Sequence, residues 1–256
     1  MSYEHNTKVL AVIPARFAST RFPQKMLAEL QGKPLVFHAY QQATQAALVT
    51  DALVATDDER IALALKPFDV PVMMTRPDHP SGTDRIAEIA QNSDAEIIVN
   101  VQGDEPLIDP AIIDQTIEPL LRDSSLLMAT ARTPLTHIED IQNPNIVKVI
   151  CNQQGHALYF SRSPIPHIRD AQDRHQAMSV YWQHVGLYAY RRDFLLQFHK
   201  MAQTPLEKLE RLEQLRALEN GIKIAVVDTS YKSIGVDTPE DLERVRDLMS
   251  QREGRN

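Results

Sequence analysis

Three cationic side chains follow an apolar run near the start of the chain, in a pattern suited to binding phosphate. The run KVLAVI, residues 8–13, leads into a loop that carries Arg16, Arg21 and Lys25. Fixed cations and backbone N–H groups at such a turn can hold a phosphate together. Residues 8–27 contain neither GxxxxGK nor GxGxxG, which argues against a Walker-type ATPase and an ordinary dinucleotide-binding site. The cations are therefore either a phosphate-binding loop or solvated surface charges.

Two acidic residues far apart in the chain are candidate magnesium ligands. Asp104, in VNVQGDEP, follows a predicted buried strand, where open α/β sheets bind ligands, and Gly103 beside it allows close backbone approach. Asp237, in GVDTPEDL, precedes a helix that Thr238 and Asp241 already cap, which leaves its carboxylate available. The two carboxylates could share a magnesium that also holds nucleotide phosphates. The alternative for Asp104 is an ordinary turn residue.

The stretch TRPDHPSGTDR, residues 75–85, has a tight polar turn at Ser81 and Gly82 before a predicted helix. Such a turn can contact a base or a ribose through its backbone groups. Thr83 is equally consistent with an N-cap that serves the helix and no ligand.

Three later stretches contain polar side chains that suit an acidic, hydroxylated substrate. They are FSRSPIP, HVGLYAY and LEKLERLEQLR, which contain Arg162, His184, Tyr188, Glu213 and Gln214. The planar fork of Arg162 matches the two oxygens of a carboxylate. Each residue is weak evidence by itself, and the charges of the last stretch are by default solvated.

Alternating strands and helices would position these side chains. Short apolar runs separated by amphipathic segments predict an α/β protein with a doubly wound, mostly parallel sheet and right-handed crossovers. The expected strands cover residues 8–13, 52–57, 70–74, 96–102 and 126–133. The expected helices cover residues 34–48, 58–66, 83–91 and 110–122.

The pattern changes between about residues 134 and 190, where NIVKVI, HALYF and HVGLYAY resemble strands without full helices between them. We expect a β-rich insertion within a single domain of residues 1–256. Beyond it, leucines at regular spacing over residues 206–220 predict one helix with a buried leucine face. The strand GIKIAVVD and a helix from Thr238 complete the expected fold.

The composition limits the partners and the compartment. The net charge of −7 argues against nucleic acid or an anionic membrane as the main partner. Cys151 is the only cysteine, so no disulfide forms within the chain, which fits a reducing cytosol. The start MSYEHNTK lacks the apolar region of a signal peptide, and no apolar run reaches the length of a membrane span. We therefore expect a cytoplasmic protein without membrane insertion.

Eight motifs, in order along nearly the whole chain, resemble the 3-deoxy-manno-octulosonate cytidylyltransferase family, also called CMP-Kdo synthetases. They are VIPARFASTRFPQK, TRPDHPSGTDR, VNVQGDEP, NPNIVKV, ALYFSRSPIP, HVGLYAYR, LEKLERLEQLR and GVDTPEDLERV. The resemblance implies a Rossmann-like nucleotidyltransferase fold, with a mostly parallel mixed sheet flanked by helices. It also implies that CTP and the acidic sugar Kdo react with Mg²⁺ to give CMP-Kdo and pyrophosphate for lipopolysaccharide biosynthesis. Members of the family are typically homodimers, and the β-rich insertion would serve sugar binding and dimerisation.

The resemblance also assigns roles to residues by motif. Catalytic roles fall to Arg16, Lys25, Asp104 and Asp237, of which Asp104 and Asp237 are the expected metal ligands. The expected nucleotide contacts are Ala15, Arg16, Lys25, Arg76, Ser81 and Gly82. The expected Kdo contacts are Gln102, Arg162, His184, Tyr188, Glu213 and Gln214. One departure stands out: the family loop usually reads PGKP, whereas this chain has PQKM, with Gln24 in place of glycine and Met26 in place of proline.

Three other functions share parts of this pattern. A cytidylyltransferase for sialic acid would have the same phosphate loop and metal ligands but a different sugar pocket. A glycosyltransferase would use a similar α/β domain and release a nucleotide rather than pyrophosphate from CTP. A regulatory protein would bind CTP without turnover.

Overall fold

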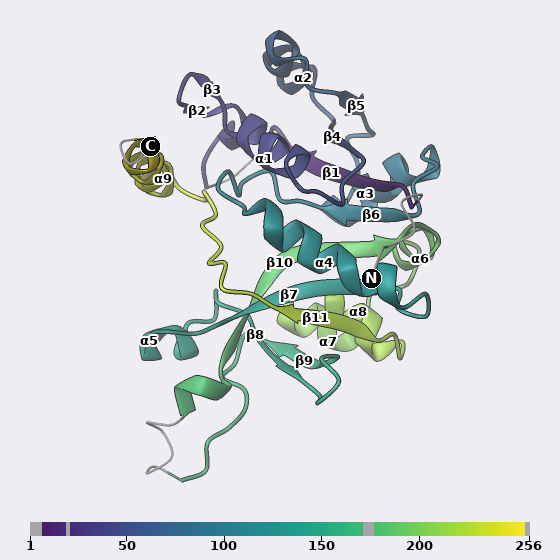
Figure 1. Ribbon diagram of the computed structural model, residues 1–256, viewed down its shortest axis with the longest axis vertical. Coiled ribbons are helices and arrows are strands. Elements are labelled where there is room, and N and C mark those ends of the chain that lie inside the picture. Colours follow the sequence, from purple (N-terminus) through teal and green to yellow (C-terminus); the bar gives the residue numbers. More distant parts are fainter. Residues whose placement is uncertain (1–6, 19–20, 171–176, 254–256) are drawn as a thin grey trace. The chain divides into compact units, whose positions relative to one another are not determined.

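The chain forms two compact units. The structure, a computed structural model, describes residues 7–18, 21–170 and 177–253. The first unit contains residues 1–114 and 233–256, and the second contains residues 115–232 (Figure 1).

The first unit is built on parallel strands in the order β5, β4, β1, β6. Strand β1 (Val9–Ala15) pairs in parallel with β4 (Asp51–Thr56) on one side and with β6 (Ile97–Asn100) on the other, and β4 pairs with β5 (Val72–Met74). All of β6 is buried, and within β1 only Pro14 is partly exposed. Continuous apolar runs of this kind are typical of parallel strands covered on both faces.

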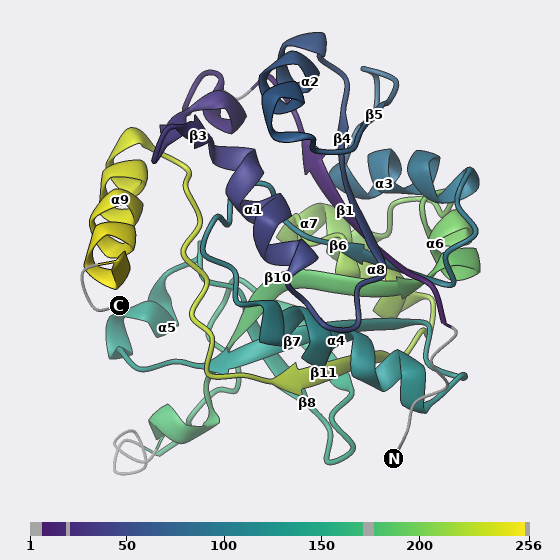
Figure 2. The same cartoon turned by 45° about the horizontal axis from the view of Figure 1, so that its top comes forward.

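Helices and short elements surround this sheet (Figure 2). The helices of the first unit are α1 (Leu35–Thr44), α2 (Glu59–Leu65), α3 (Gly82–Gln91) and α9 (Pro239–Glu253), and α4 (Pro110–Arg122) begins in it. The short elements are the 3-10 helices η1 (Lys25–Leu27) and η2 (Lys66–Phe68) and the paired strands β2 (Glu29–Leu30) and β3 (Lys33–Pro34). Helices α1 and α3 pack against both β1 and β4. None of the helices in the described residues is both long and apolar enough to cross a bilayer.

The C-terminal segment joins the first unit through its own apolar cluster. Leu242 and Val245 of α9 and Val236 before it pack with Leu30 and Leu107, and all of these are at most 5% exposed. Burial of apolar surface is the main stabilising term in such a cluster. It fixes the segment that carries Asp237 within this unit.

The second unit has a mixed sheet. Its strands are β7 (Met128–Pro134), β8 (Lys148–Cys151), β9 (Ala157–Ser161), β10 (Trp182–Arg191) and β11 (Ile224–Asp228). Its helices are α5 (Ile138–Gln142), η4 (Ala177–Val180), α6 (Arg192–Phe198), α7 (Pro205–Glu210) and α8 (Gln214–Glu219). Strand β7 is antiparallel to β10 and parallel to β11, and β8 is antiparallel to both β10 and β9.

The predicted fold class is confirmed: mostly parallel strands alternate with helices, and α4 spans the predicted residues 110–122. The insertion over about residues 134–190 of a single domain stays a prediction. Within that range the structure has β8, β9 and most of β10.

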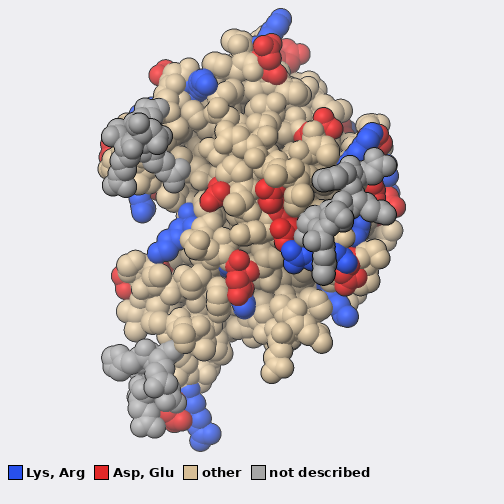
Figure 3. Space-filling model, viewed as in Figure 1, with Lys and Arg blue, Asp and Glu red and all other residues tan. Residues whose placement is uncertain are grey.

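The charged side chains on the face drawn in Figure 3 are of mixed sign, with Lys and Arg interspersed among Asp and Glu.

The single leucine-rich helix predicted near the end of the second unit is wrong. The backbone of Arg211 turns left-handed, with φ 55°, and ends α7 before α8 begins. A buried ion pair, with Arg216 Nε 2.9 Å from Glu207 Oε2, then holds the two short helices together. The predicted leucine face is divided accordingly, because Leu209 is 80% exposed and Leu215 is fully buried.

Gly103 packs tightly where β6 leads into the loop of Asp104. A Cβ at Gly103 would lie 3.1 Å from the carbonyl oxygen of Pro14, 3.2 Å from Sδ of Met26 and 3.3 Å from Cγ2 of Ile13. These distances are shorter than ordinary van der Waals contacts, so a larger residue forces its neighbours to move. Met26, one of the two departures from the family loop, therefore packs directly against this glycine.

We expect Gly103→Ala to destabilise the protein by about 1–3 kcal/mol, because it overpacks a closed contact. The matched control is Gly235→Ala, since a Cβ at Gly235 meets nothing within 4 Å. Urea denaturation of the two variants measures the difference. Equal stability of both variants would contradict the packing described for Gly103.

Candidate functional site

The side chain of Lys25 lies between two carboxylates of the first unit. Its Nζ donates to Oδ2 of Asp104 at 2.7 Å and to Oδ1 of Asp237 at 2.9 Å. The other carboxylate oxygen of Asp237 lies 3.0 Å from Nη2 of Arg21. The Lys25 side chain is only 9% exposed, whereas those of Asp104 and Asp237 are 28% and 44% exposed. The ammonium is thus buried, and the carboxylates that hold it remain accessible to a ligand from solvent.

Three loops bring these residues together. Lys25 opens η1, Asp104 follows β6, and Asp237 precedes α9. The N–H of Val236 donates to the carbonyl of Asp104 at 2.9 Å, which joins two of the loops directly. The strands β1 and β6 are parallel, so the loops of Lys25 and Asp104 leave the sheet at its carboxyl edge, where open α/β sheets bind ligands.

The predicted capping box at the start of α9 is confirmed. The N–H of Thr238 donates to Oδ2 of Asp241 at 2.9 Å, and the N–H of Asp241 donates to Oγ1 of Thr238 at 3.2 Å. The same Oδ2 accepts the N–H of Asp237 at 3.0 Å. Because these groups satisfy the helix start, the Asp237 carboxylate is not used for capping and contacts Lys25 instead.

The opposite charges around Lys25 decide its protonation. Burial by itself lowers the pKa of the ammonium, but the charges and hydrogen bonds of Asp104 and Asp237 outweigh it, so the pKa of Lys25 lies above its usual value. The side chain is therefore a full cation at neutral pH. It lies between two oxygen donors of the kind that bind hard divalent cations.

The two carboxylates fit a magnesium ion that arrives with a phosphorylated ligand. Proteins commonly hold Mg²⁺ through one or two carboxylates and leave its other positions to water and substrate phosphates. Within residues 7–18, 21–170 and 177–253, no three His, Cys, Asp or Glu side chains form a metal-binding group. The donor set of Asp104 and Asp237 therefore suits a metal shared with a ligand rather than one enclosed by protein.

Gln24, in place of the glycine of the family loop, adopts the conformation that glycine favours. Its backbone is left-handed, with φ 58° and ψ 26°. The turn closes through two hydrogen bonds, from Lys25 N–H to Phe22 O at 3.2 Å and from Leu27 N–H to Gln24 O at 2.8 Å. A side chain in this region costs roughly 1–2 kcal/mol. The turn that presents Lys25 is thus formed without glycine, at the expense of a strained residue.

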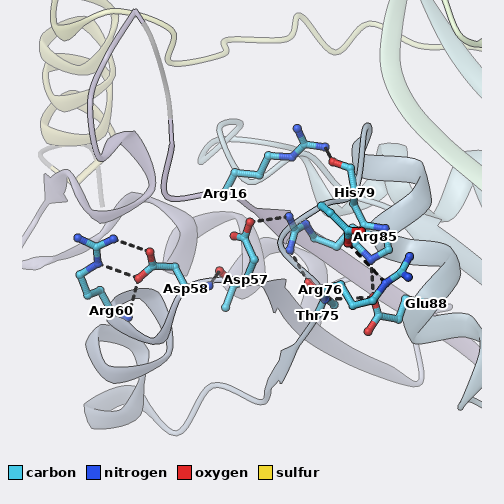
Figure 4. Close-up of polar contacts among 11 residues, drawn as sticks. Arg16, Asp57, Asp58, Arg60, Thr75, Arg76, His79, Arg85 and Glu88 are labelled. Carbon is cyan, nitrogen blue, oxygen red and sulfur yellow. Dashed lines mark hydrogen bonds and ion pairs between the residues drawn. The ribbon is translucent and has the colours of Figure 1, made fainter.

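The expected nucleotide contacts Ala15, Arg16 and Arg76 lie in different surroundings. Ala15 is fully buried at the end of β1. Arg16, the next residue, is partly exposed, and its Nη2 donates to the carbonyl of His79 at 3.2 Å (Figure 4). Arg76 is exposed, with Nε 3.6 Å from a carboxylate oxygen of Asp78. Ser19 and Thr20 of the predicted phosphate loop lie outside the described residues.

Ser81 is the N-cap of α3. Its Oγ accepts the N–H of Asp84 at 3.1 Å and donates to the Asp84 carboxylate at 2.6 Å. The alternative in which Thr83 caps the helix is wrong, because α3 already begins at Gly82. Gly82 lies beside β1, where a Cβ would be 3.6 Å from the ring of Pro14. The turn therefore places the N-terminus of α3 against the residue before Ala15.

Sequence reasoning missed a buried polar network behind this turn. Arg85 is fully buried; its Nη1 donates to Oγ1 of Thr75 and its Nη2 to Oδ2 of Asp57 at 3.0 Å (Figure 4). His79 contacts the carboxylate of Glu88. The sequence contains a signal for Asp57, because this acidic residue follows the parallel strand β4 in the way that Asp104 follows β6. No local pattern marked Glu88.

Two expected sugar contacts on β10 are uncharged. His184 is partly buried, and its Nε2 lies 2.9 Å from Oγ1 of Thr130. Its ring is 5.0 Å from that of Phe160 and 5.3 Å from that of Tyr188. Burial lowers the pKa of His184 to about 3. Burial, followed by the charge of Glu213, raises the pKa of Tyr188 well above its ordinary value. At neutral pH both side chains are therefore neutral hydrogen-bonding groups.

The other expected sugar contacts are partly engaged by the protein. Arg162 donates through Nε to the carbonyl of Glu210 at 2.7 Å and through Nη1 to that of Pro144 at 2.9 Å. Gln214 is buried, and its Nε2 has no hydrogen-bond partner in the described part of the chain. Gln102 belongs to the first unit and the other five to the second. A buried amide donor without an acceptor is costly unless a ligand satisfies it.

Comparisons with known proteins agree on one family. A family model described as cytidylyltransferase matches residues 10–224. A 3-deoxy-manno-octulosonate cytidylyltransferase of Geobacter metallireducens is 54% identical over 250 residues, which cover 95% of this chain and 98% of the relative. One of Geotalea daltonii is 54% identical over 251 residues, which cover 96% of this chain and 99% of the relative.

Solved structures give the same picture. The structure of a CMP:2-keto-3-deoxy-manno-octonic acid synthetase complexed with CTP superimposes with a TM-score of 0.91 at 42% identity, covering 96% of this chain and all of that one. A cytidylyltransferase of Leptospira borgpetersenii has a TM-score of 0.62 at 18% identity, covering 96% of this chain and 88% of that one. The second similarity shows the fold alone.

We expect Gln24→Gly to stabilise the protein. The release of a left-handed side chain, worth roughly 1–2 kcal/mol, exceeds the backbone entropy that glycine loses, roughly 0.5–1 kcal/mol. The matched control is Gln41→Gly in α1, which is exposed and should cost about 1 kcal/mol. Denaturation midpoints of both variants measure the two effects. A destabilising Gln24→Gly would show that the Gln24 side chain makes a compensating interaction.

Proposed function

The chain belongs to the 3-deoxy-manno-octulosonate cytidylyltransferase family, and from this premise we propose that it transfers the cytidylyl group of CTP to Kdo. The products are CMP-Kdo and pyrophosphate, so the enzyme is a nucleotidyltransferase. The observation that carries the proposal is the cluster of Lys25, Asp104 and Asp237 at the carboxyl edge of the sheet. It combines a cation for phosphate with two carboxylates for a metal.

The proposal includes Mg²⁺ held by Asp104 and Asp237. Both carboxylates are accessible to solvent and both contact one cationic atom. A magnesium ion held there would supply positive charge that stabilises the phosphates. Asp104 and Asp237 would orient the bound nucleotide through that ion, while the buried stem of Lys25 directs its ammonium toward the same place.

Arg16 and Lys25 would stabilise the charge that develops on the leaving pyrophosphate. The anomeric hydroxyl of Kdo would attack the α-phosphorus: a new P–O bond forms, the bond to the pyrophosphate oxygen breaks, and the hydroxyl proton passes to solvent water. The phosphate oxygens offer Lys25 new acceptors, so its ammonium can exchange carboxylates for phosphate without loss of hydrogen bonds. Most of the catalysis is then positioning and electrostatic stabilisation. His184 is too weak a base, with a pKa of about 3, to take the hydroxyl proton.

The sugar contacts of the second unit fit a polyhydroxylated acid. Neutral His184 and Tyr188 can bind hydroxyl groups, and the buried Nε2 of Gln214 needs an acceptor. The Arg162 guanidinium is held by two carbonyls through Nε and Nη1, and its remaining N–H groups can donate to a substrate carboxylate. We propose the same set, with Glu213 and Gln102, as the Kdo contacts.

The proposal extends to three further properties of the family. They are a homodimeric assembly, a cytoplasmic location and the supply of CMP-Kdo for lipopolysaccharide biosynthesis. The single cysteine supports the cytoplasmic location.

A coupled pyrophosphate assay tests the function. We expect the protein with CTP and Mg²⁺ to release pyrophosphate when Kdo is present, and to give only background release with sialic acid or without sugar. Asp104→Asn should lower kcat at least about 100-fold, since it removes a charge that holds the metal. Asp51→Asn is the matched control, because Asp51 is exposed at the start of β4, and it should retain normal turnover. Release with sialic acid but not Kdo would refute the substrate, and normal turnover of Asp104→Asn would refute the metal assignment.

Removal of the Lys25 charge should allow Asp104 and Asp237 to bind Mg²⁺ more tightly when no nucleotide is present. The ammonium compensates part of the negative charge of both carboxylates, so Lys25→Met leaves Asp104 without this cation and Asp237 with Arg21. We expect calorimetry with MgCl₂ alone to give a Kd at least about tenfold lower for Lys25→Met than for the unaltered protein, or about 1.4 kcal/mol. Lys66→Met is the matched control, because Lys66 is exposed in the same unit. Unchanged affinity in Lys25→Met would mean that Asp104 and Asp237 do not bind the ion.

A further inference from the structure

His79 is a buried histidine whose ring is held by a carboxylate. Its side chain is only 4% exposed, and its Nε2 contacts Oε2 of Glu88 on α3. The same Oε2 accepts the backbone N–H of Arg76 at 3.2 Å. One carboxylate oxygen therefore fastens the loop before α3 at two points, the backbone of Arg76 and the side chain of His79 (Figure 4).

The Glu88 carboxylate is ionised in this arrangement. Burial works to raise its pKa, but the hydrogen bonds from the His79 ring and the Arg76 backbone and the nearby positive charges outweigh burial, so the pKa of Glu88 lies below its ordinary value. An ionised acceptor makes stronger hydrogen bonds than a neutral one. The contact is thus a firm attachment of the loop to the helix.

The loop itself has few conformations available. Pro77 and Pro80 lie on either side of Asp78 and His79. Each proline fixes its own φ and restricts the residue before it. Pro80 restricts the backbone of His79 and Glu88 holds its ring, so together they limit the directions that the His79 carbonyl can take.

That carbonyl accepts a hydrogen bond from Arg16. The distance from Arg16 Nη2 to His79 O is 3.2 Å, and Arg16 is partly exposed directly after β1. A long side chain at such a position loses considerable rotamer freedom when it binds a ligand, unless the protein already holds it. The carbonyl of His79 supplies that hold.

We propose that Glu88 and His79 are positioning residues, which orient the Arg16 guanidinium for contact with the phosphates of a nucleoside triphosphate. The proposal rests on the proposed function, in which Arg16 contacts the triphosphate. In this role neither side chain needs to touch the nucleotide. They act through the His79 carbonyl and lower the entropic cost of fixing Arg16 on the ligand.

A double-mutant cycle tests the proposal, with CTP affinity measured by calorimetry. We expect Glu88→Ala to weaken CTP binding about tenfold when Arg16 is present and by less than about twofold in the Arg16→Ala background, because residues that act through one another are not additive. Glu88→Gln keeps the shape of the side chain and should weaken binding less than Glu88→Ala. Glu96→Ala is the matched control, since Glu96 is exposed in the same unit, and it should leave CTP affinity unchanged.

The outcomes separate the proposal from the proposed function. Equal weakening by Glu88→Ala in both backgrounds would overturn the positioning role and show a general structural effect. If Glu88→Ala does not fold, the same cycle with Glu88→Gln and with His79→Asn decides the question by the same criterion. If the wild-type protein releases no pyrophosphate from CTP and Kdo, the proposed function is refuted. If the wild-type protein releases pyrophosphate but the effects of the Glu88 and Arg16 substitutions on CTP affinity are additive, only the positioning role is refuted.

Discussion

The placement of the Lys25 ammonium between Asp104 and Asp237 is the interaction on which the rest of the first unit depends. A buried cation is stable only when opposite charges and hydrogen bonds compensate for its lost hydration. Both carboxylates are therefore needed, although they lie 79 and 212 positions from Lys25 in the chain. The apolar cluster of α9 holds the C-terminal segment, and with it Asp237, in the first unit. The turn at Gln24 presents Lys25 to both carboxylates.

The same arrangement accounts for the proposed chemistry. In the free protein the charges of the site satisfy one another, so neither the cation nor the carboxylates lack a partner. A nucleoside triphosphate with magnesium would offer new partners to the cation and to the carboxylates at once: phosphate oxygens for Lys25, and a divalent cation for Asp104 and Asp237. Groups already held in place need little reorganisation during the reaction, which is the basis of electrostatic catalysis. The buried contacts behind Arg16 extend this principle to the other cation that we propose to contact phosphate.

Local sequence patterns predicted the elements well and the contacts between distant residues poorly. Apolar runs and periodicity are local, so the strand and helix order and the capping box of Thr238 and Asp241 could be read directly. Left-handed residues that are not glycine carry no such signal, which is why the break at Arg211 was missed. Lys25 was assigned to phosphate, but its pairing with two distant carboxylates depends on the tertiary fold. The contact of Glu88 with His79 was missed for the same reason.

Anomalous diffraction from crystals with CTP and Mn²⁺ in place of Mg²⁺ would test the central claim most directly. The account predicts an anomalous peak in coordination contact with an oxygen of Asp104 and an oxygen of Asp237. It also predicts that Nζ of Lys25 has left both carboxylates and hydrogen-bonds to phosphate oxygens. A metal peak away from these two carboxylates, with Lys25 still between them, would contradict the account.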